Sequence, residues 1–253
     1  MRIQGLLLLA AACGLAACKA ESKLPSGAAL LFDVAFSAPE NSAGAAPTLV
    51  DPNATQPWPS KSPSQIFMGA PKVVAELCGL TDQPLALTSA SGQQSHEGVE
   101  FLLDQRYGHY HIELDVCAQQ IGIPPLQAME PQLAIFLDIP QAYAIGFFEK
   151  GRIVVIDQVR GIDAVLNPEV IGRYELGKPL HLAIDFDTMA QTWSIAFDGK
   201  QAFAGKLAPV LPRAVRVVIR GNESNAAAID NFVVWAENDL SIAAPEESGE
   251  VPK

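Results

Sequence analysis

The sequence is poor in charge, and most of the charge it has is negative. Only 18% of its 253 residues are charged, and 17 Lys and Arg against 28 Asp and Glu give a formal net charge of −11. Proteins that bind nucleic acids need clustered Lys and Arg to neutralise phosphates. The chain is therefore a poor candidate for DNA or RNA binding, and we expect no nucleic-acid partner.

The sequence also lacks the patterns of helical, fibrous and several catalytic proteins. No stretch of ordinary helix length repeats its apolar residues at the 3.6-residue period of an amphipathic helix. The 19 Pro and 19 Gly are scattered, which excludes collagen and coiled coil and predicts many turns. There is no Gly-x-Ser-x-Gly, His-Glu-x-x-His or phosphate-binding loop motif. We expect no cofactor, and a non-catalytic protein more than an enzyme.

The N-terminus has the pattern of an export signal. Arg2 precedes the apolar run 6–12, which is shorter than the about 20 residues that span a membrane. Leu15-Ala-Ala-Cys18 resembles a bacterial lipoprotein signal, which implies a signal peptide of residues 1–17 and acylation of Cys18. Cys13 is the competing cysteine, but Ala10 stands where that signal prefers Leu. In the alternative, Cys18 follows an ordinary secretory cleavage site and stays a free thiol.

The resemblance to lipoproteins implies a place in the cell envelope. Acyl chains on Cys18 would anchor the protein to a membrane through a short tether, residues 18–28. Lys19 in place of Asp is similar to lipoproteins sent to the outer membrane. We expect the protein there, facing the periplasm or the exterior.

Two further cysteines remain after cleavage, in an oxidising compartment. If Cys18 is acylated, Cys78 and Cys117 form an even pair, and we predict a disulfide between them. Closing a loop of about 40 residues would remove roughly 4 kcal/mol of unfolded-chain entropy. The alternative is two buried thiols.

Two segments without a strand pattern border the predicted domain, residues 29–235. Residues 37–64 contain six of the nineteen prolines and are predicted to be a surface loop. Residues 236–253 contain five acidic residues against one Lys and are predicted to be a disordered tail.

Between these segments, apolar and polar residues alternate as in half-buried strands. Tyr110, Ile112, Leu114 and Val116 alternate with polar residues over 110–116. Further strands are predicted at 29–36, 99–103, 132–139, 142–149, 152–157, 180–187, 192–198, 201–204, 215–220 and 228–235. Lys150-Gly151 and Asp198-Gly199 predict tight hairpins. About a dozen strands joined by hairpins predict an all-β fold, an antiparallel two-sheet β-sandwich.

The C-terminal half resembles a known family of β-sandwiches. Gly172-Arg-Tyr174, the strand 180–187, Trp193 to Gly199 and Ile229-Asp230-Asn231 follow one another as in the concanavalin A-like lectin/glucanase superfamily, particularly its laminin-G-like jelly rolls. The resemblance covers residues 170–235 and implies a concanavalin A-like jelly roll. Lectins, glycosidases and adhesion modules all share this fold, so it does not decide the function.

The sharpest polar cluster is His109-x-His111-x-Glu113-x-Asp115. Its period of two places all four side chains on one face of a strand, with neighbours about 6.5–7 Å apart. Imidazole and carboxylate ligands suit Zn²⁺, so a metal site is one hypothesis, although no distant His can be identified as a further ligand. The other interpretation is the solvent-facing side of a half-buried strand.

Part of the same strand resembles a glycosidase signature. Glu113-Leu-Asp115 is similar to the Glu-x-Asp-x-x-Glu or Glu-x-Asp-x-Glu motif of laminarinase-like enzymes. Retaining hydrolysis needs two carboxyl groups about 5–5.5 Å apart, one of them a proton donor. Cys117 and Ala118 stand where the acid/base Glu belongs, so this activity is not the favoured one.

The aromatic residues leave two readings open. Trp193 and Trp235 lie in strongly apolar strands and are predicted to be core. Tyr107, Tyr110 and Tyr143 either line a glycan groove or pack between the sheets.

Taken together, the export signal and the family resemblance predict a lipid-anchored envelope protein whose non-catalytic, lectin-like sandwich binds a glycan or another surface component. A structural envelope or adhesion protein without a small ligand is the alternative, and a glycoside hydrolase is the third.

Overall fold

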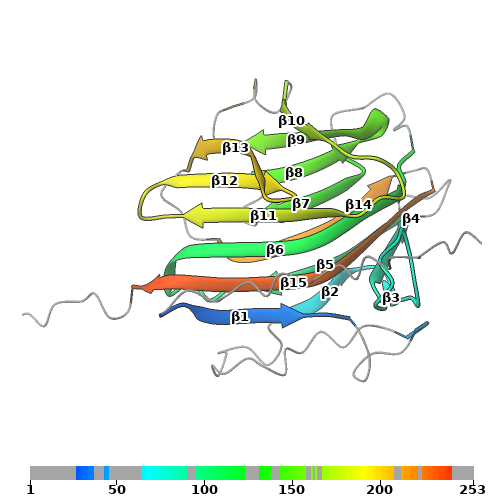
Figure 1. Ribbon diagram of the computed structural model, residues 1–253, viewed down its shortest axis with the longest axis horizontal. Helices are drawn as coiled ribbons and strands as arrows, with labels where there is room; N and C mark the ends of the chain where they lie inside the picture. The colour runs from blue at the N-terminus through cyan, green and yellow to red at the C-terminus, as the bar shows by residue number, and fades with distance from the viewer. Residues whose placement is uncertain are drawn as a thin grey trace, which may run out of the picture.

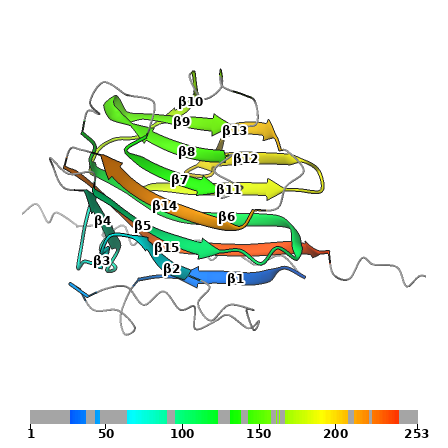
Figure 2. The same cartoon turned by 180° about the vertical axis from the view of Figure 1, so that it is seen from behind.

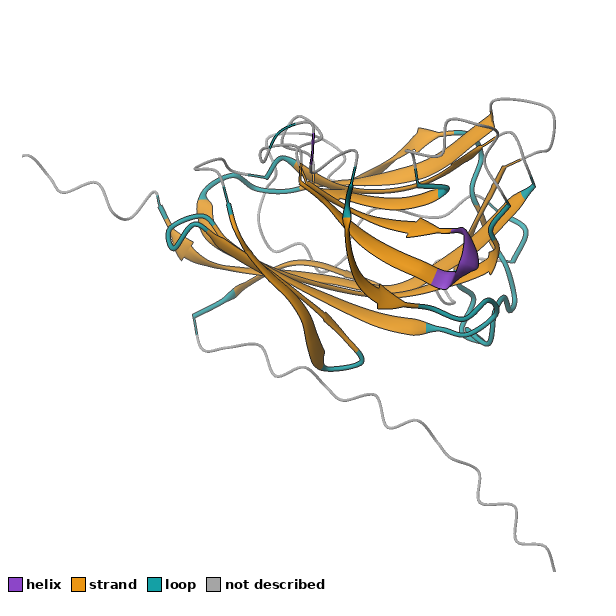
Figure 3. Cartoon of the chain, turned by 90° about the horizontal axis from the view of Figure 1, so that it is seen from above, coloured by secondary structure: helices purple, strands orange, loops and turns teal. Residues whose placement is uncertain are grey.

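The chain forms two antiparallel sheets that pack face to face, as the computed structural model shows (Figures 1 and 3). The structure describes residues 27–36, 43–45, 64–89, 95–122, 131–137, 143–157, 161, 163, 167–207, 212–221 and 224–240. The all-β, two-sheet sandwich predicted from the sequence is confirmed. The predicted signal peptide and Cys18 lie outside the described residues, as do residues 18–26 of the tether.

Sheet A has eight strands and sheet B has seven. Sheet A contains β1 (Ala29–Val34), β3 (Lys72–Val73), β4 (Leu85–Ser89), β6 (Tyr107–Gln120), β11 (Leu180–Asp187), β12 (Thr192–Phe197), β13 (Lys200–Lys206) and β15 (Asn225–Asp239). Sheet B contains β2 (Ser64–Met68), β5 (Ser95–Leu102), β7 (Leu133–Leu137), β8 (Tyr143–Phe148), β9 (Arg152–Asp157), β10 (Glu169–Arg173) and β14 (Ala214–Gly221). The short 3₁₀ turn η1 (Glu149–Gly151) joins β8 to β9.

The long strands β6 and β15 lie side by side in the middle of sheet A. The order of sheet A is β13-β12-β11-β6-β15-β4-β3. On the side away from β6, β15 pairs with β4 through residues 225–229 and with β1 through residues 232–236. Sheet B runs β10-β9-β8-β7-β14-β5-β2 (Figure 2). The neighbours of β6 are therefore β11 and β15, and these three strands position the candidate site.

Side chains from both sheets fill the space between them. Trp193 is 2% exposed and its ring centroid lies 5.2 Å from that of Tyr143, which confirms that this tryptophan belongs to the core. Tyr107 and Tyr110 are buried in the same cluster. All three tyrosines therefore pack between the sheets and do not line a groove.

The predicted disulfide between Cys78 and Cys117 is confirmed. Cys117 belongs to β6, and Cys78 lies in a turn closed by hydrogen bonds between Leu77 and Leu80. The two half-cystines pack with Leu80 and Ala228 in a small apolar cluster. The bridge therefore attaches the turn to the central strand of sheet A. Within the described part of the chain, no helix has the length and hydropathy needed to cross a bilayer.

Several strands differ from the sequence-based prediction. Strands β2, β3, β4 and β10 were not predicted, and β2 begins at Ser64, the last residue of the predicted Pro-rich loop. Most of that loop lies outside the described residues. Strand β15 continues to Asp239, so residues 236–239 belong to the sheet and not to the predicted tail. Residues 241–253 lie outside the described residues.

Candidate functional site

The outer face of sheet A carries a row of histidines and carboxylates across its three central strands. On one side of β6, the register places His109 opposite Asp187, His111 opposite Asp185 and Asp115 opposite His181 of β11. On the other side, β15 places Trp235 opposite His111 and Glu237 opposite His109. We call this set the histidine–carboxylate face; it comprises His109, His111, Glu113, Asp115, His181, Asp185, Asp187, Trp235 and Glu237.

His111 lies at the centre of this face. Its Nδ1 lies 2.7 Å from Oδ1 of Asp185, and its Nε2 lies 2.7 Å from Oε1 of Glu113. A neutral imidazole donates from one ring nitrogen only, whereas an ionised carboxylate can only accept. Two carboxylate partners therefore fit the protonated ring. Burial by itself lowers the pKa of His111, but these two hydrogen bonds outweigh burial and raise the pKa to about 9.

His109 and His181 repeat this pairing on either side of His111. The Nδ1 atom of His109 lies 3.3 Å from Oε2 of Glu237, and its Nε2 lies 3.6 Å from Oδ1 of Asp185. The Nδ1 atom of His181 lies 2.8 Å from Oδ1 of Asp115. The pKa of His109 is raised chiefly by Asp185, and that of His181 chiefly by Asp115.

Two carboxylates on this face, Asp185 and Glu113, have a lowered pKa. Hydrogen bonds from His109 and His111 hold the pKa of Asp185 well below its usual range. The hydrogen bond from His111 likewise lowers the pKa of Glu113. A carboxylate has about four lone-pair sites, so each of them can still accept hydrogen bonds from a ligand.

A β-bulge in β15 adds an amide to the face. The register between β15 and β6 shifts between Asp230 and Val233, and Asn231 adopts a φ of 49°. The side chain of Asn231 donates to Oδ2 of Asp115 over 2.6 Å. The Ile-Asp-Asn segment that carried the family resemblance is therefore the bulge that fixes Asp115.

Trp235 lies on this face and not in the core, which corrects the sequence-based prediction. Its ring stacks on His111, with ring centroids 4.4 Å apart and an interplanar angle of 24°, and it is partly exposed. The apolar residues Phe232, Val234 and Ala236 point inward on alternate positions of β15. Side chains of a strand point alternately to its two faces, so Trp235 points to the outer face of sheet A together with Val233 and Glu237.

The four residues of the predicted cluster share one face, but their geometry does not assemble a metal centre. His109, His111, Glu113 and Asp115 are each engaged in ion pairs or hydrogen bonds with neighbours on the face. Among the described residues, no group of three or more His, Cys, Asp or Glu side chains could hold a metal ion. What the arrangement offers is a set of charged acceptors and donors beside an indole ring.

Sequence reasoning did not connect four members of the face with β6: His181, Asp185 and Asp187 of β11, and Glu237 of β15, all far from β6 in the chain. His181, Asp185 and Asp187 alternate with inward-facing residues of β11, so their shared outer face could have been inferred. The identity of the strand next to β6 could not be inferred, because the described residues between Gln120 and Leu180 form four strands of sheet B before the chain returns to sheet A.

A second feature lies at one end of the sandwich. A pocket of about 380 Å³ is bordered by Ile121, Lys150, Gly151, Tyr174, Glu175 and Leu176. Ile121 follows β6 of sheet A, whereas Lys150 and Gly151 belong to the turn between β8 and β9 of sheet B. The pocket therefore lies where the two sheets end together.

Comparisons with known proteins find relatives by structure alone. No protein-family model matches the chain, and no curated protein matches it. Among solved structures, a sialidase superposes with a TM-score of 0.54 and 18% identity over 85% of this chain and 19% of its own. This chain therefore spans about a fifth of the sialidase.

Two further structures are matched along nearly their whole length. Domain 4 of AbnA, a GH43 extracellular arabinanase from Geobacillus stearothermophilus in complex with arabinotriose, gives a TM-score of 0.51 at 15% identity, covering 86% of this chain and 100% of its own. A chain from work on endo-acting O-glycanases of the human gut microbiota gives 0.53 at 10% identity, covering 83% and 99%. At these identities the likeness shows a shared β-sandwich fold.

Proposed function

We propose that this protein is a lipid-anchored, non-catalytic glycan-binding protein of the bacterial envelope, and that the histidine–carboxylate face is its binding surface. The observation that carries the proposal is the position of Trp235. This partly exposed indole lies on the outer face of sheet A, stacked on His111, beside carboxylates that can accept further hydrogen bonds.

The chemistry of this face matches that of a sugar. A pyranose presents apolar C–H groups on its ring faces and hydroxyl donors around its edge. Trp235 supplies an apolar aromatic surface with a polar N–H. Asp185 and Glu237, whose side chains are 46% and 30% exposed, supply acceptors for hydroxyl groups within the same face.

Three features of the site favour binding over hydrolysis. A general acid needs a raised pKa, whereas His111 lowers the pKa of Glu113. Asp115 is held by His181 and Asn231. Cys117, in the region where the glycosidase signature places its acid/base residue, forms the disulfide. The signature residues therefore act as parts of a polar network.

The structural neighbours agree with a binding module. Domain 4 of the arabinanase AbnA is matched over its entire length and was solved with arabinotriose. Its likeness to this chain lies in the fold, and the transfer of a saccharide ligand to this chain belongs to the proposal.

The envelope location rests on the N-terminal sequence. The apolar run and Leu15-Ala-Ala-Cys18 support acylation at Cys18, eleven residues before the first strand, which begins at Ala29. Glycans of the cell surface are within reach of such a protein.

A glycan array probed with the mature domain tests the proposal. The array contains arabino-oligosaccharides, mucin O-glycans, β-glucans and bacterial polysaccharides. We expect binding to at least one class, and a weakening of about ten-fold or more in Trp235→Ala, because the aromatic contact is lost. A ten-fold change corresponds to about 1.4 kcal/mol.

Val170→Ala is the matched control. Val170 is also an exposed apolar side chain, 51% exposed, but it belongs to the edge strand β10 of sheet B. The control should bind as the wild type does, and circular dichroism should show that both variants keep the β fold. Absence of binding to every class on the array would instead favour a structural envelope protein.

A further inference from the structure

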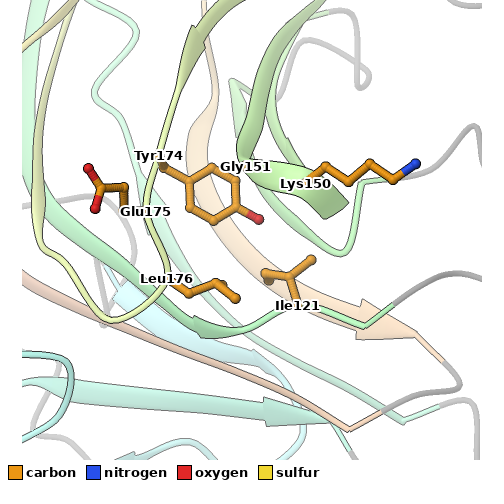
Figure 4. A pocket seen from close by; sticks show the side chains of 6 residues that line it. All are labelled: Ile121, Lys150, Gly151, Tyr174, Glu175 and Leu176. Carbon is orange, nitrogen blue, oxygen red and sulfur yellow. The ribbon is translucent and has the colours of Figure 1, made fainter.

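The pocket at the end of the sandwich has walls of two kinds. Figure 4 shows the side chains of Leu176 and Ile121 below the ring of Tyr174, with Lys150 and Glu175 on opposite sides. Leu176 is 56% exposed, so its apolar surface is open to a ligand in the pocket. The floor is thus apolar, and charged groups stand at its rim.

The two charges at the rim are not equivalent. Glu175 forms an ion pair with Lys178, three residues further along the chain. Lys150 forms no ion pair with any described residue, although the chain carries a net charge of −11. At the rim, the carboxylate of Glu175 is therefore already paired with a cation, whereas the ammonium group of Lys150 is available to an anionic ligand.

The backbone holds Lys150 in an unusual conformation. Its φ of 63° and ψ of 24° lie in the left-handed region, which costs a side chain with a Cβ about 1 kcal/mol. Such conformations persist where the surrounding structure imposes them, and they gather at functional sites. Asn or Gly would adopt this conformation at lower cost.

Contacts across the pocket impose the turn. The amide of Tyr174 donates to the carbonyl of Gly151 over 2.9 Å. A Cβ at Gly151 would lie 2.5 Å from the carbonyl oxygen of Tyr174, so only glycine fits there. The hydroxyl of Tyr174 donates to the carbonyl of Phe148 over 2.7 Å. The turn that carries Lys150 is therefore fixed to the opposite wall of the pocket.

We propose that this pocket is a second binding site, separate from the histidine–carboxylate face, that takes an acidic saccharide residue whose carboxylate pairs with Lys150. The C–H face of the sugar packs on Leu176 and Ile121, and its hydroxyl groups meet Glu175 and the backbone of the turn. The proposal rests on the pocket alone and does not need the face to bind a glycan.

Two probes that differ in one group test the charge requirement. Methyl β-D-glucuronide carries a carboxylate where methyl β-D-glucoside carries a hydroxymethyl group. Titration of ¹⁵N-labelled protein should shift the amide signals of Ile121, Gly151 and Leu176 with the glucuronide, and the glucoside should bind about five-fold more weakly. An exposed ion pair contributes up to about 1 kcal/mol, which is about five-fold.

Substitutions at Lys150 test the assigned cation. Lys150→Gln should weaken glucuronide binding about five-fold and leave the glucoside unchanged. Lys200→Gln is the matched control, because Lys200 follows the other predicted hairpin turn, Asp198-Gly199, and does not border the pocket. Lys150→Asn should weaken binding in the same way while raising the melting temperature. If Lys150 had only a structural role, a variant with a higher melting temperature would not bind the glucuronide more weakly.

The outcomes separate this proposal from the proposed function. Equal affinity for the two glycosides, or shifts confined to residues outside the pocket, would overturn it. Equal binding of acetate would show a simple anion site and would also overturn the assignment of a saccharide. Shifts at His109, His111 and Trp235 would concern the histidine–carboxylate face, so either site can fail while the other stands.

Discussion

His111 makes the stability of the protein depend on pH. The pKa of the folded imidazole is about 9, above the about 6.5 of an unfolded chain, because Asp185 and Glu113 stabilise the charged ring against the cost of burial. A raised pKa contributes stability that is complete below pH 6.5 and is lost as the pH rises through 9. The side chain is 15% exposed, so we expect a loss on the order of 1–2 kcal/mol after solvent screening.

Urea unfolding at pH 6.5 and pH 9.5 measures this effect. The free energy of unfolding of the wild type should fall between these two values, and that of His111→Gln should fall less. His96→Gln serves as control, because His96 belongs to β5 of sheet B and pairs with no carboxylate among the described residues. Equal slopes for the wild type and His111→Gln would refute the assigned ion pairs.

How far the sequence predicts the candidate site depends on which residues share a strand. His109, His111, Glu113 and Asp115 follow one another with a period of two, so a local rule places them on one face. Trp235 follows the same alternation. Its apolar neighbours in the sequence nevertheless suggested that it is buried, because alternation alone does not show which face of β15 packs against sheet B. Side chains that come together from different strands depend on strand order, which is a property of the whole fold.

At the scale of elements, sequence patterns predict the strands that have one buried face and one exposed face, because these strands alternate apolar and polar residues. Strand β11 has the bounds expected from its alternation, residues 180–187. Strand β4 lacks that signal because four of its five residues are buried, and an apolar run of this length also fits a buried helix segment. Strand β10 is an exposed edge strand with a bulge between Val170 and Gly172, which breaks the period of two.

The Cys78–Cys117 disulfide links two parts of sheet A that are not paired with each other through backbone hydrogen bonds. The turn at residues 77–80 lies between the short strands β3 and β4, at the edge of sheet A, whereas Cys117 belongs to its central strand. The bridge spans 39 residues, so its removal should cost up to about 4 kcal/mol of unfolded-chain entropy.

The double variant Cys78→Ala/Cys117→Ala should therefore unfold at a lower urea concentration than the wild type. A reducing agent should lower the stability of the wild type toward that of the variant, and it should leave the variant unchanged. The far-ultraviolet spectrum of the variant should stay that of a β protein, because both sheets keep their strand pairing. Unchanged stability in the variant would show that the turn is held without the bridge.

At the scale of the whole molecule, the proposed lipid tether would limit where the binding surfaces can lie. Strand β1 begins at Ala29, eleven residues after Cys18. A fully extended chain spans at most about 3.3–3.6 Å per residue, so an acylated Cys18 would keep the start of the domain within about 40 Å of its membrane. The ligands of such a protein are therefore components close to that membrane.

The acylation of Cys18 can be tested in a bacterial host that processes lipoproteins. Labelled palmitate should be incorporated into the wild type, and the N-terminal peptide of the mature protein should begin at an acylated Cys18. Cys18→Ala should incorporate no label and should accumulate as a precursor that is 17 residues longer, since processing of a lipoprotein signal depends on its cysteine. Cys13→Ala is the matched control: it removes the competing cysteine, which lies within the predicted signal peptide, and should be labelled and processed as the wild type is. Label that persists in Cys18→Ala, or that is lost in Cys13→Ala, would place the anchor elsewhere and would remove the basis for the 40 Å limit.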